Sequence, residues 1–327
     1  MLKKLMPDGF TLLLVGCVVL ASLLPARGGA VVVLAWATKA AIMLLFFMHG
    51  ARLSREAIIG GMGNWRLHIA VALATFLLFP VLGLAVAALP PTVLHPDLKS
   101  GFLFLSILPS TVQSSIAFTS IAGGNVAAAV CSASLSNIAG VFLTPLLAGL
   151  LMGSSVASGG GIGDAILTVS LTLLLPFVAG HLSRPWTGAF VHRHKAMLGR
   201  LDRGSILLVV YASFSAAVIE GLWHEVSWSD MLAILLVSLG MLAVMLGLTW
   251  WVGRKLFSRE DEIVLLFCGS KKSLASGVPM AAALFPAAQV GLMILPLMFF
   301  HQIQLILCAI LARGYADAAA AKVREAA

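Results

Sequence analysis

Polar side chains gather in the middle of two otherwise apolar segments. The first segment carries the run Pro109-Ser110-Thr111-Val112-Gln113-Ser114-Ser115, and the second carries Gly269-Ser270-Lys271-Lys272-Ser273. Hydroxyl and amide oxygens are ligands for hard cations, whereas a lysine ammonium is a point charge that binds anions or carbonyl oxygens. The two runs together predict a site for an ion or a small charged solute.

The pair Lys271 and Lys272 is the most unusual feature of the second run. A lysine at the centre of an apolar span costs about 2.5–3.5 kcal/mol on insertion scales, so two adjacent ones need a reason. Neighbouring residues on a helix point about 100° apart, so we expect one lysine to face the site and the other to line a water-filled cavity. The alternative is that both reach outward from the end of a misplaced span. No carboxylate occurs between Asp97 and Asp164, so the predicted site is neutral or net positive.

The elements that carry these residues must cross a membrane. The chain has 327 residues, of which 60% are hydrophobic and 10% charged, whereas a soluble domain has about 25% charged residues. The net charge of +8 lies in short loops and forms no long basic tract, which favours a lipid bilayer over nucleic acid as the partner. Four cysteines without CxxC spacing indicate neither a disulfide nor a zinc site, and no cofactor is expected.

Apolar runs bounded by glycine, proline and charge predict ten transmembrane helices. The first five lie near residues 10–25, 31–50, 67–89, 101–123 and 126–152, and the second five near 162–182, 204–223, 231–252, 262–284 and 289–312.

Basic residues predict the orientation of these spans. With the N-terminus in the cytoplasm, sixteen lysines and arginines fall in inside segments, and only Arg27 and Lys99 fall in outside loops. This bias predicts that both termini are cytoplasmic, in an integral protein of the cell (inner) membrane. The alternative is that residues 3–25 form a cleavable signal peptide, but removing one span would reverse the charge bias of every later loop.

Five spans in each half is an odd number, so homologous halves, residues 1–153 and 154–327, must lie upside down relative to each other. Such inverted repeats are typical of transporters. The run Gln113-Ser114-Ser115-Ile116-Ala117 corresponds to Lys271-Lys272-Ser273-Leu274-Ala275, and Ser136-Asn137 corresponds to His301-Gln302. The fold class is therefore all-α, with helices 4 and 9 broken near the midplane, where freed backbone groups are tolerated only if buried or hydrated. The alternative is that the prolines are ordinary kinks and that serine and threonine return hydrogen bonds to their own helices.

The predicted substrate or ion site gathers the polar residues of these four spans. It comprises Thr111, Gln113, Ser114, Ser115, Asn137, Ser270, Lys271, Lys272, Ser273, His301 and Gln302. Asn137, His301 and Gln302 fit interhelical hydrogen bonding as well as they fit the lining of a site. Outside this set, Lys39 is expected to extend outward to the interface.

These motifs resemble the bile acid:sodium symporter family, most closely the branch related to cation:proton antiporters and to the seventh vertebrate member. The residues that carry the resemblance are Leu108 to Ser115 continuing through Gly124-Asn125, then Ser134-Leu135-Ser136-Asn137, and Cys268 to Leu274. The resemblance implies ten helices in two inverted repeats. It also implies a panel domain of spans 1, 2, 6 and 7 and a core domain of spans 3–5 and 8–10, with helices 4 and 9 crossing.

The resemblance also bears on sodium. Sodium-coupled members of the family use a small polar pair in helix 4 and a glutamate with a glutamine in helix 9. Ser114 and Ser115 match the polar pair, but Ser270 or Lys272 stands where the acid is expected, and the helix-5 ligands fall near Ala129 and Ala133. The candidate sodium ligands are therefore Ser114, Ser115 and Ser270. A nearby ammonium repels sodium, so we expect a lysine to take the place of the ion.

The sequence thus predicts a secondary transporter that carries a small organic anion by alternating access, independent of sodium. One alternative is an antiporter coupled to a proton or another cation, and another is a membrane regulator that does not transport. An enzyme is not expected, because the spans hold no HExxH, no GxSxG and no paired carboxylates. The sequence carries no signal of oligomeric state.

Overall fold

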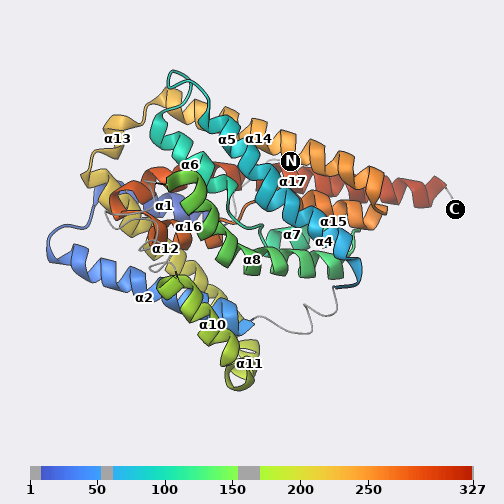
Figure 1. The fold of residues 1–327 in the computed structure, drawn as a ribbon, viewed down its shortest axis with the longest axis horizontal. Helices are drawn as coiled ribbons and strands as arrows, with labels where there is room; N and C mark the ends of the chain where they lie inside the picture. The colour runs from blue at the N-terminus through green and yellow to red at the C-terminus, as the bar shows by residue number, and fades with distance from the viewer. Residues whose placement is uncertain (1–8, 53–61, 154–169, 326–327) are drawn as a thin grey trace.

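The computed structural model describes residues 9–52, 62–153 and 170–325, and within these ranges the chain is helical and has no strand (Figure 1). Six of the described helices are long and apolar enough to cross a membrane: Gly29–Arg52, Trp65–Ala87, Val126–Met152, Lys195–Ile219, Trp228–Leu256 and Ala287–Ala321. Two shorter apolar helices cover Leu12–Leu23 and Leu171–Leu182. The predicted all-α membrane protein is confirmed at this level.

The first part of the chain runs from α1 to α8. Its helices are α1 (Gly9–Leu23), α2 (Gly29–Arg52), α4 (Trp65–Leu73), α5 (Phe79–Ala87), α6 (Pro96–Ser106), α7 (Gln113–Ile121) and α8 (Val126–Met152). A short 3₁₀ turn, η2 (Met62–Asn64), precedes α4, and a π-helical segment, η3 (Ala74–Leu78), joins α4 to α5.

The second part runs from η5 to α17. Its elements are η5 (Ser170–Leu174), α10 (Leu175–Leu182), α11 (Arg184–Arg193), α12 (Lys195–Ile219), α13 (Leu222–Glu225), α14 (Trp228–Leu256), α15 (Arg259–Gly269), α16 (Leu274–Leu284) and α17 (Ala287–Glu325). The predicted span 162–182 begins outside the described residues. Helix α17 continues past its predicted end at residue 312, because the following residues are rich in the strong helix formers alanine, lysine, arginine and glutamate.

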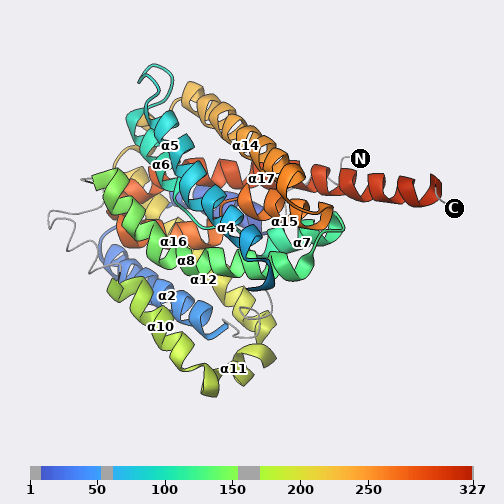
Figure 2. The same ribbon diagram turned by 45° about the vertical axis from the view of Figure 1, so that its right-hand side comes forward.

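The helices pack in two groups that α12 joins, since α12 also packs against α16 and α17. Helix α2 packs against α10 and α12, and α1 packs against α12. On the other side, α6 packs against α5 and α17, while α14 packs against α15 and α17. Figures 1 and 2 both show α2, α10 and α11 together at one side of the molecule, away from α14, with the C-terminal end of α17 projecting beyond the bundle.

The turn between α7 and α8 is fixed by glycine and asparagine. Gly123 has φ of 75°, a left-handed conformation that suits glycine. The Gly123 N–H donates to Ser120 O (3.2 Å) and the Gly124 N–H to Thr119 O (2.8 Å), which is the Schellman ending of a helix. Asn125 then caps α8 by accepting the Ala128 N–H at 3.0 Å. This turn positions α7 and α8 beside each other, and both contribute to the site described next.

Candidate functional site

Two helices are interrupted where the sequence places its polar runs. Helix α6 ends at Ser106 and α7 begins at Gln113, whereas α15 ends at Gly269 and α16 begins at Leu274. The two non-helical segments touch, because the Ser273 N–H donates to Pro109 O at 2.9 Å. The breaks therefore meet at one place, called the crossing below, which comprises residues 107–112 and 270–273.

Five consecutive carbonyl oxygens at the first break, those of residues 106–110, find donors. The donors come from the second break and from α8: Lys272 Nζ binds Ser106 O (2.7 Å) and Leu108 O (2.6 Å), Thr144 Oγ1 binds Ile107 O (2.8 Å), Ser273 N binds Pro109 O (2.9 Å), and Asn137 Nδ2 binds Ser110 O (2.8 Å). An unpaired buried carbonyl costs about 1–3 kcal/mol. Polar side chains on neighbouring elements are thus what allow helix α6 to end inside the protein.

The Lys272 ammonium lies at the centre of this arrangement. The residue is 0% exposed, and its Nζ donates to Thr75 O (2.8 Å) as well as to Ser106 O and Leu108 O. Its three N–H groups therefore each have a main-chain acceptor. The Phe79 ring lies 4.2 Å from Nζ and adds a cation–π contact. The ammonium also lies at the C-terminal end of α6, where the helix dipole is negative and favours a cation.

The Thr75 carbonyl is available because of the π-helical segment before α5. In this segment the hydrogen bonds span five residues, as in the bond from Phe79 N–H to Ala74 O. Pro80 lies five residues after Thr75 and has no N–H to continue the pattern. The Thr75 carbonyl is therefore free to accept from Lys272, which gives this rare helix form a direct role at the crossing.

Gln304 on α17 holds the backbone of Lys272. The Lys272 N–H donates to Gln304 Oε1 at 2.9 Å, and Gln304 Nε2 donates to Lys272 O at 2.8 Å. His301 Nδ1 lies 2.8 Å from Gln304 Nε2, and Gln304 is 0% exposed. Gln304 is absent from the site predicted from sequence, although it lies three residues after His301 and therefore on the same helix face.

Lys271 has a different environment. It is also 0% exposed, but the described residues offer its Nζ one hydrogen-bond acceptor, Ser114 Oγ at 3.3 Å. The rings of Phe118 and Phe267 lie 4.5 and 5.7 Å from Nζ. The expectation that one lysine lines a water-filled cavity is wrong in this structure, and so is the alternative that both reach outward, because both side chains are fully buried.

A cluster of hydroxyl groups surrounds the Lys271 side of the crossing. Ser114 Oγ donates to Thr111 Oγ1 at 2.8 Å, and Thr111 Oγ1 lies 3.0 Å from Ser115 Oγ. Ser115 Oγ in turn donates to Phe267 O, at the end of α15, at 2.9 Å. The structure thus brings Thr111, Ser114, Ser115 and Lys271 together.

The opposite side of the crossing is held by α8 and α16. Ser273 caps α16 by accepting the Ser276 N–H at 3.2 Å, and its Oγ donates to Ser276 Oγ at 3.1 Å. Ser276 Oγ donates to Asn137 Oδ1 at 2.9 Å. Asn137 and Ser273 are therefore joined through Ser276, another residue absent from the predicted site.

Four predicted residues remain: Ser270, Gln113, His301 and Gln302. Ser270 Oγ returns to its own helix and donates to Leu266 O at 2.5 Å. Gln113 is exposed at the start of α7, so it is not the ammonium acceptor that its position in the run suggests. His301 is half-buried beside Gln304, and Gln302 is half-buried at the next position of α17.

The candidate sodium ligands do not form one coordination shell. Ser114 and Ser115 share the hydroxyl cluster, but the Ser270 hydroxyl is bound to Leu266 O. Ala129 and Ala133 are fully buried in an apolar cluster with Val264, Leu265 and Cys268. Of the carboxylates in the described ranges, none lies within 4 Å of the Lys271 or Lys272 nitrogen. The crossing thus offers hydroxyl and carbonyl oxygens to a cation. Among the described residues it offers no negative side chain to compensate the cation's charge.

We predict that Gln304→Met lowers the melting temperature of the purified protein, because it leaves the Lys272 N–H and C=O buried without partners. Each such group costs about 1–3 kcal/mol. Gln289→Met is the matched control, since Gln289 is exposed near the start of α17. Thermal unfolding in nanodiscs measures the effect, and equal melting temperatures for the two variants would show that Gln304 does not hold the crossing.

Comparisons with known proteins identify the family of the chain. Residues 8–317 match the SBF-like CPA transporter family. The chain is 56% identical over 327 residues to an uncharacterized protein of Pseudomonas aeruginosa, covering 99% of this chain and 98% of the relative. It is 57% identical over 309 residues to the putative symporter YfeH of Escherichia coli (94% and 92% covered) and 26% identical over 319 residues to sodium/bile acid cotransporter 7-B of Xenopus laevis (95% and 92% covered). The resemblance noted from the motifs is confirmed, and two of these three relatives carry the name of a symporter or cotransporter rather than of an enzyme. The chain belongs to the SBF-like CPA transporter family.

Proposed function

We propose that this chain is a secondary active transporter that carries a small organic anion by alternating access. Two relatives are named as a symporter and a cotransporter, which supports transport as the activity. The positive crossing supports an anion as the substrate, since two ammonium groups lie there without a described carboxylate within 4 Å. The half-helices α7 and α16 also begin at the breaks, and helix N-termini favour negative charge.

The proposed architecture has ten spans in two inverted repeats, residues 1–153 and 154–327. In this assignment α6 with α7 is span 4, and α15 with α16 is span 9. Spans 1, 2, 6 and 7 form a panel, which the packing of α2 on α10 and of α1 on α12 supports. The remaining spans form a core around the crossing. Both termini are cytoplasmic, and the protein lies in the cell (inner) membrane.

Lys272 is proposed to act as a fixed cation in place of sodium. The observation that carries this proposal is the set of three hydrogen bonds, 2.6–2.8 Å long, from its Nζ to main-chain carbonyls of two separate spans. Such carbonyls are hard oxygen ligands of the kind that bind a metal cation. A tethered ammonium supplies the positive charge permanently, so transport should proceed without sodium.

Lys271 is proposed to be the lysine that meets the substrate. Its one described hydrogen bond, 3.3 Å to Ser114, leaves the ammonium with donors to offer to an anion. Thr111 and Ser115 lie beside Ser114 and add hydroxyl groups to the same side of the crossing. Alternating access would then expose this side to one face of the membrane at a time.

Proton-coupled exchange is a second candidate, and the same observation favours it. Lys271 has one described hydrogen bond, whereas Lys272 has three, so loss of a proton from Lys271 would break fewer contacts of the crossing. Lys271 would then release a proton in one half of the cycle and regain it in the other. Lys272 would keep its three hydrogen bonds to main-chain carbonyls throughout the cycle.

The orientation predicts how single cysteines react in a background where the four native cysteines are replaced. Cysteines at Lys99 and at Trp228, which is 91% exposed at the start of α14, should react with an impermeant maleimide on intact cells. A cysteine at His194, between α11 and α12, should react only after the membrane is opened. Labelling of position 194 on intact cells would contradict the ten-span orientation.

Uptake of the transported anion into proteoliposomes should be unchanged when sodium is replaced by choline. Lys272→Met should reduce uptake at least tenfold. Uptake by Lys272→Arg should be little higher than uptake by Lys272→Met. The planar guanidinium does not fit a set of carbonyl groups arranged around a point charge. Lys255→Met, at an exposed position of α14, is the charge-matched control. Because Lys272 variants can misfold, uptake is compared only for variants that elute as folded protein.

The same assay separates the candidate mechanisms. The fixed-cation proposal would be contradicted if uptake by the wild type depended saturably on sodium and Lys272→Met kept that dependence. Proton-coupled exchange, rather than simple anion carriage, would be established by three results together. Uptake would be driven by a pH gradient, it would be lost in Lys271→Met, and it would not depend on sodium.

A further inference from the structure

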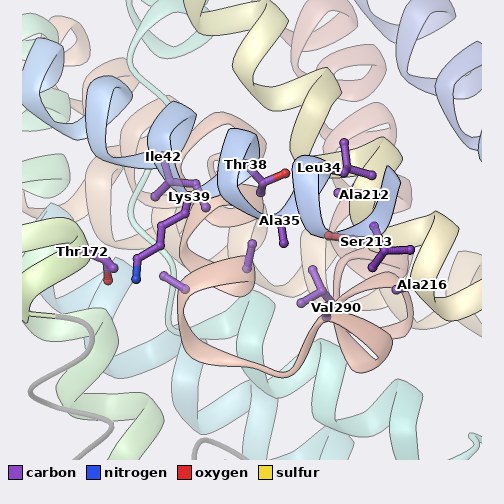
Figure 3. A pocket seen from close by; sticks show the side chains of 14 residues that line it. Leu34, Ala35, Thr38, Lys39, Ile42, Thr172, Ala212, Ser213, Ala216 and Val290 are labelled. Atoms are coloured by element: carbon purple, nitrogen blue, oxygen red, sulfur yellow. The ribbon is translucent and has the colours of Figure 1, made fainter. Parts of the chain in front are cut away.

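Helix α12 lines two hollows that open on opposite sides of the helix. On one side, Ala212, Ser213 and Ala216 line a cavity together with residues of α2, η5, α16 and α17 (Figure 3). On the other side, Leu207 lines a groove together with residues of α1. At 100° per residue, the three cavity positions lie about 120–180° around the helix from Leu207. The groove is therefore a separate feature, and none of the crossing residues lines it.

The groove is an apolar trough with a volume of about 300 Å³. It is lined by Leu12, Leu13, Gly16, Cys17, Leu20 and Leu207. Leu12 and Leu13 are each 57% exposed, so the groove opens toward the surroundings of the helices. The Cys17 thiol is already engaged, because its Sγ donates to Leu207 O at 3.2 Å. The residues that line the groove thus offer an occupant no free polar side-chain atom, which suits a hydrocarbon chain.

Gly16 makes the groove hollow. A methyl group at this position would meet no heavy atom of another described element within 4 Å. The backbone at Gly16 is helical, and glycine inside a helix is less stable than alanine. Neither packing nor backbone conformation within the described chain therefore requires a glycine here. The space is left open for an occupant from outside the described chain.

A cation lies at one end of the groove. Arg203 lies one turn before Leu207 on α12 and therefore on the same helix face. Its guanidinium carbon is 5.7 Å from the centroid of the Phe10 ring, at the start of α1. Arg203 is exposed, and none of the described carboxylates lies within 4 Å of its nitrogens. The neighbouring Asp202 binds Arg52 instead. A guanidinium of this kind can bind two phosphate oxygens at once.

The length of the groove matches one leaflet of a bilayer. From Phe10 to Leu20, α1 rises about 15 Å at 1.5 Å per residue, and the hydrocarbon core of a bilayer is about 30 Å thick. A chain that starts at Arg203 and follows the groove to Leu20 therefore ends near the midplane. Arg203 lies where the predicted seventh span begins, which is the level of a headgroup. Arg200, three residues earlier, is also exposed and adds positive charge there.

We infer that the groove between α1 and α12 binds one anionic phospholipid. The phosphate pairs with Arg203, and an acyl chain lies over Gly16 between the exposed leucines. Basic residues between transmembrane helices on the cytoplasmic side are a recurrent means of holding anionic headgroups. The cytoplasmic leaflet follows from the proposed orientation of the termini. The site goes beyond the proposed transport, because a lipid here occupies neither the crossing nor the cavity of Figure 3.

Native mass spectrometry of the purified full chain tests the headgroup. The chain is titrated with phosphatidylglycerol or with phosphatidylcholine of the same acyl chains. The wild type should bind the first phosphatidylglycerol at least fivefold more tightly than the first phosphatidylcholine. Arg203→Gln should lower the affinity for phosphatidylglycerol to that for phosphatidylcholine. Arg66→Gln should change nothing, and it is a matched control because Arg66 is also exposed and lies 5.7 Å from an aromatic ring, that of Trp65.

The same titration tests the groove. Gly16→Leu fills the hollow and should weaken binding of both lipids at least fivefold. Gly240→Leu is the matched control, because Gly240 of α14 is exposed and a methyl group there would also meet no described heavy atom within 4 Å. Equal affinity of the wild type for the two lipids would overturn the inference. Unchanged affinity for phosphatidylglycerol in Arg203→Gln or in Gly16→Leu would overturn it as well.

Should these variants fail to fold, cross-linking of the wild type decides. Phosphatidylglycerol with a diazirine in its acyl chain should label α1 between residues 12 and 20, and excess phosphatidylglycerol should suppress this labelling more than phosphatidylcholine does. Equal suppression by both lipids, or no labelling of α1, would contradict the site. A cross-link between two copies of the chain through a single cysteine at position 16 would show that a second copy covers the groove, which also overturns the inference. These experiments measure lipid binding alone, so a negative result leaves the proposed transport of an anion intact.

Discussion

The structure depends on one constraint, which is that a helix cannot end inside a membrane unless its last carbonyl groups find donors. Helix α6 ends at Ser106, and the donors for its freed carbonyls come from Lys272, Ser273, Asn137 and Thr144. The Lys272 ammonium is the strongest of these, because it carries a full charge and binds carbonyls of two spans at once. Three features position the Lys272 ammonium. They are the π-helical segment at Thr75, the proline at position 80, and the hydrogen bonds of Gln304 to the Lys272 backbone.

This constraint explains why two adjacent lysines have different tasks. Lys272 is fully engaged by main-chain acceptors, so it contributes to the architecture of the crossing. Lys271 has one long hydrogen bond to a serine, so it keeps donors for a substrate or a proton it can exchange.

The breaks are predictable from the sequence, because proline, glycine and adjacent charges rarely occur together within an apolar span unless its helix is interrupted there. The two lysines and the hydroxyl groups of Thr111, Ser114 and Ser115 stand out in the sequence for the same reason. Gln304, Ser276 and the Thr75 carbonyl do not, because their roles depend on how far each helix is rotated and on which main-chain groups a distant π-helical segment releases. Gln113 shows the same limit, since the rotation of α7 leaves its side chain exposed while Ser115, two residues later, is buried. The inverted symmetry and the panel and core domains stay predictions.

The measurement that tests the central claim most directly is the effect of sodium on thermal unfolding of the wild type and of Lys272→Ala, with choline as the comparison ion. A ligand that binds only the folded state raises the melting temperature with its concentration. If the ammonium occupies the place of a cation, sodium should leave the wild-type melting temperature unchanged. It should stabilise Lys272→Ala, whose three carbonyls are left open to an ion. Saturable stabilisation of the wild type by sodium, with none in Lys272→Ala, would contradict the account.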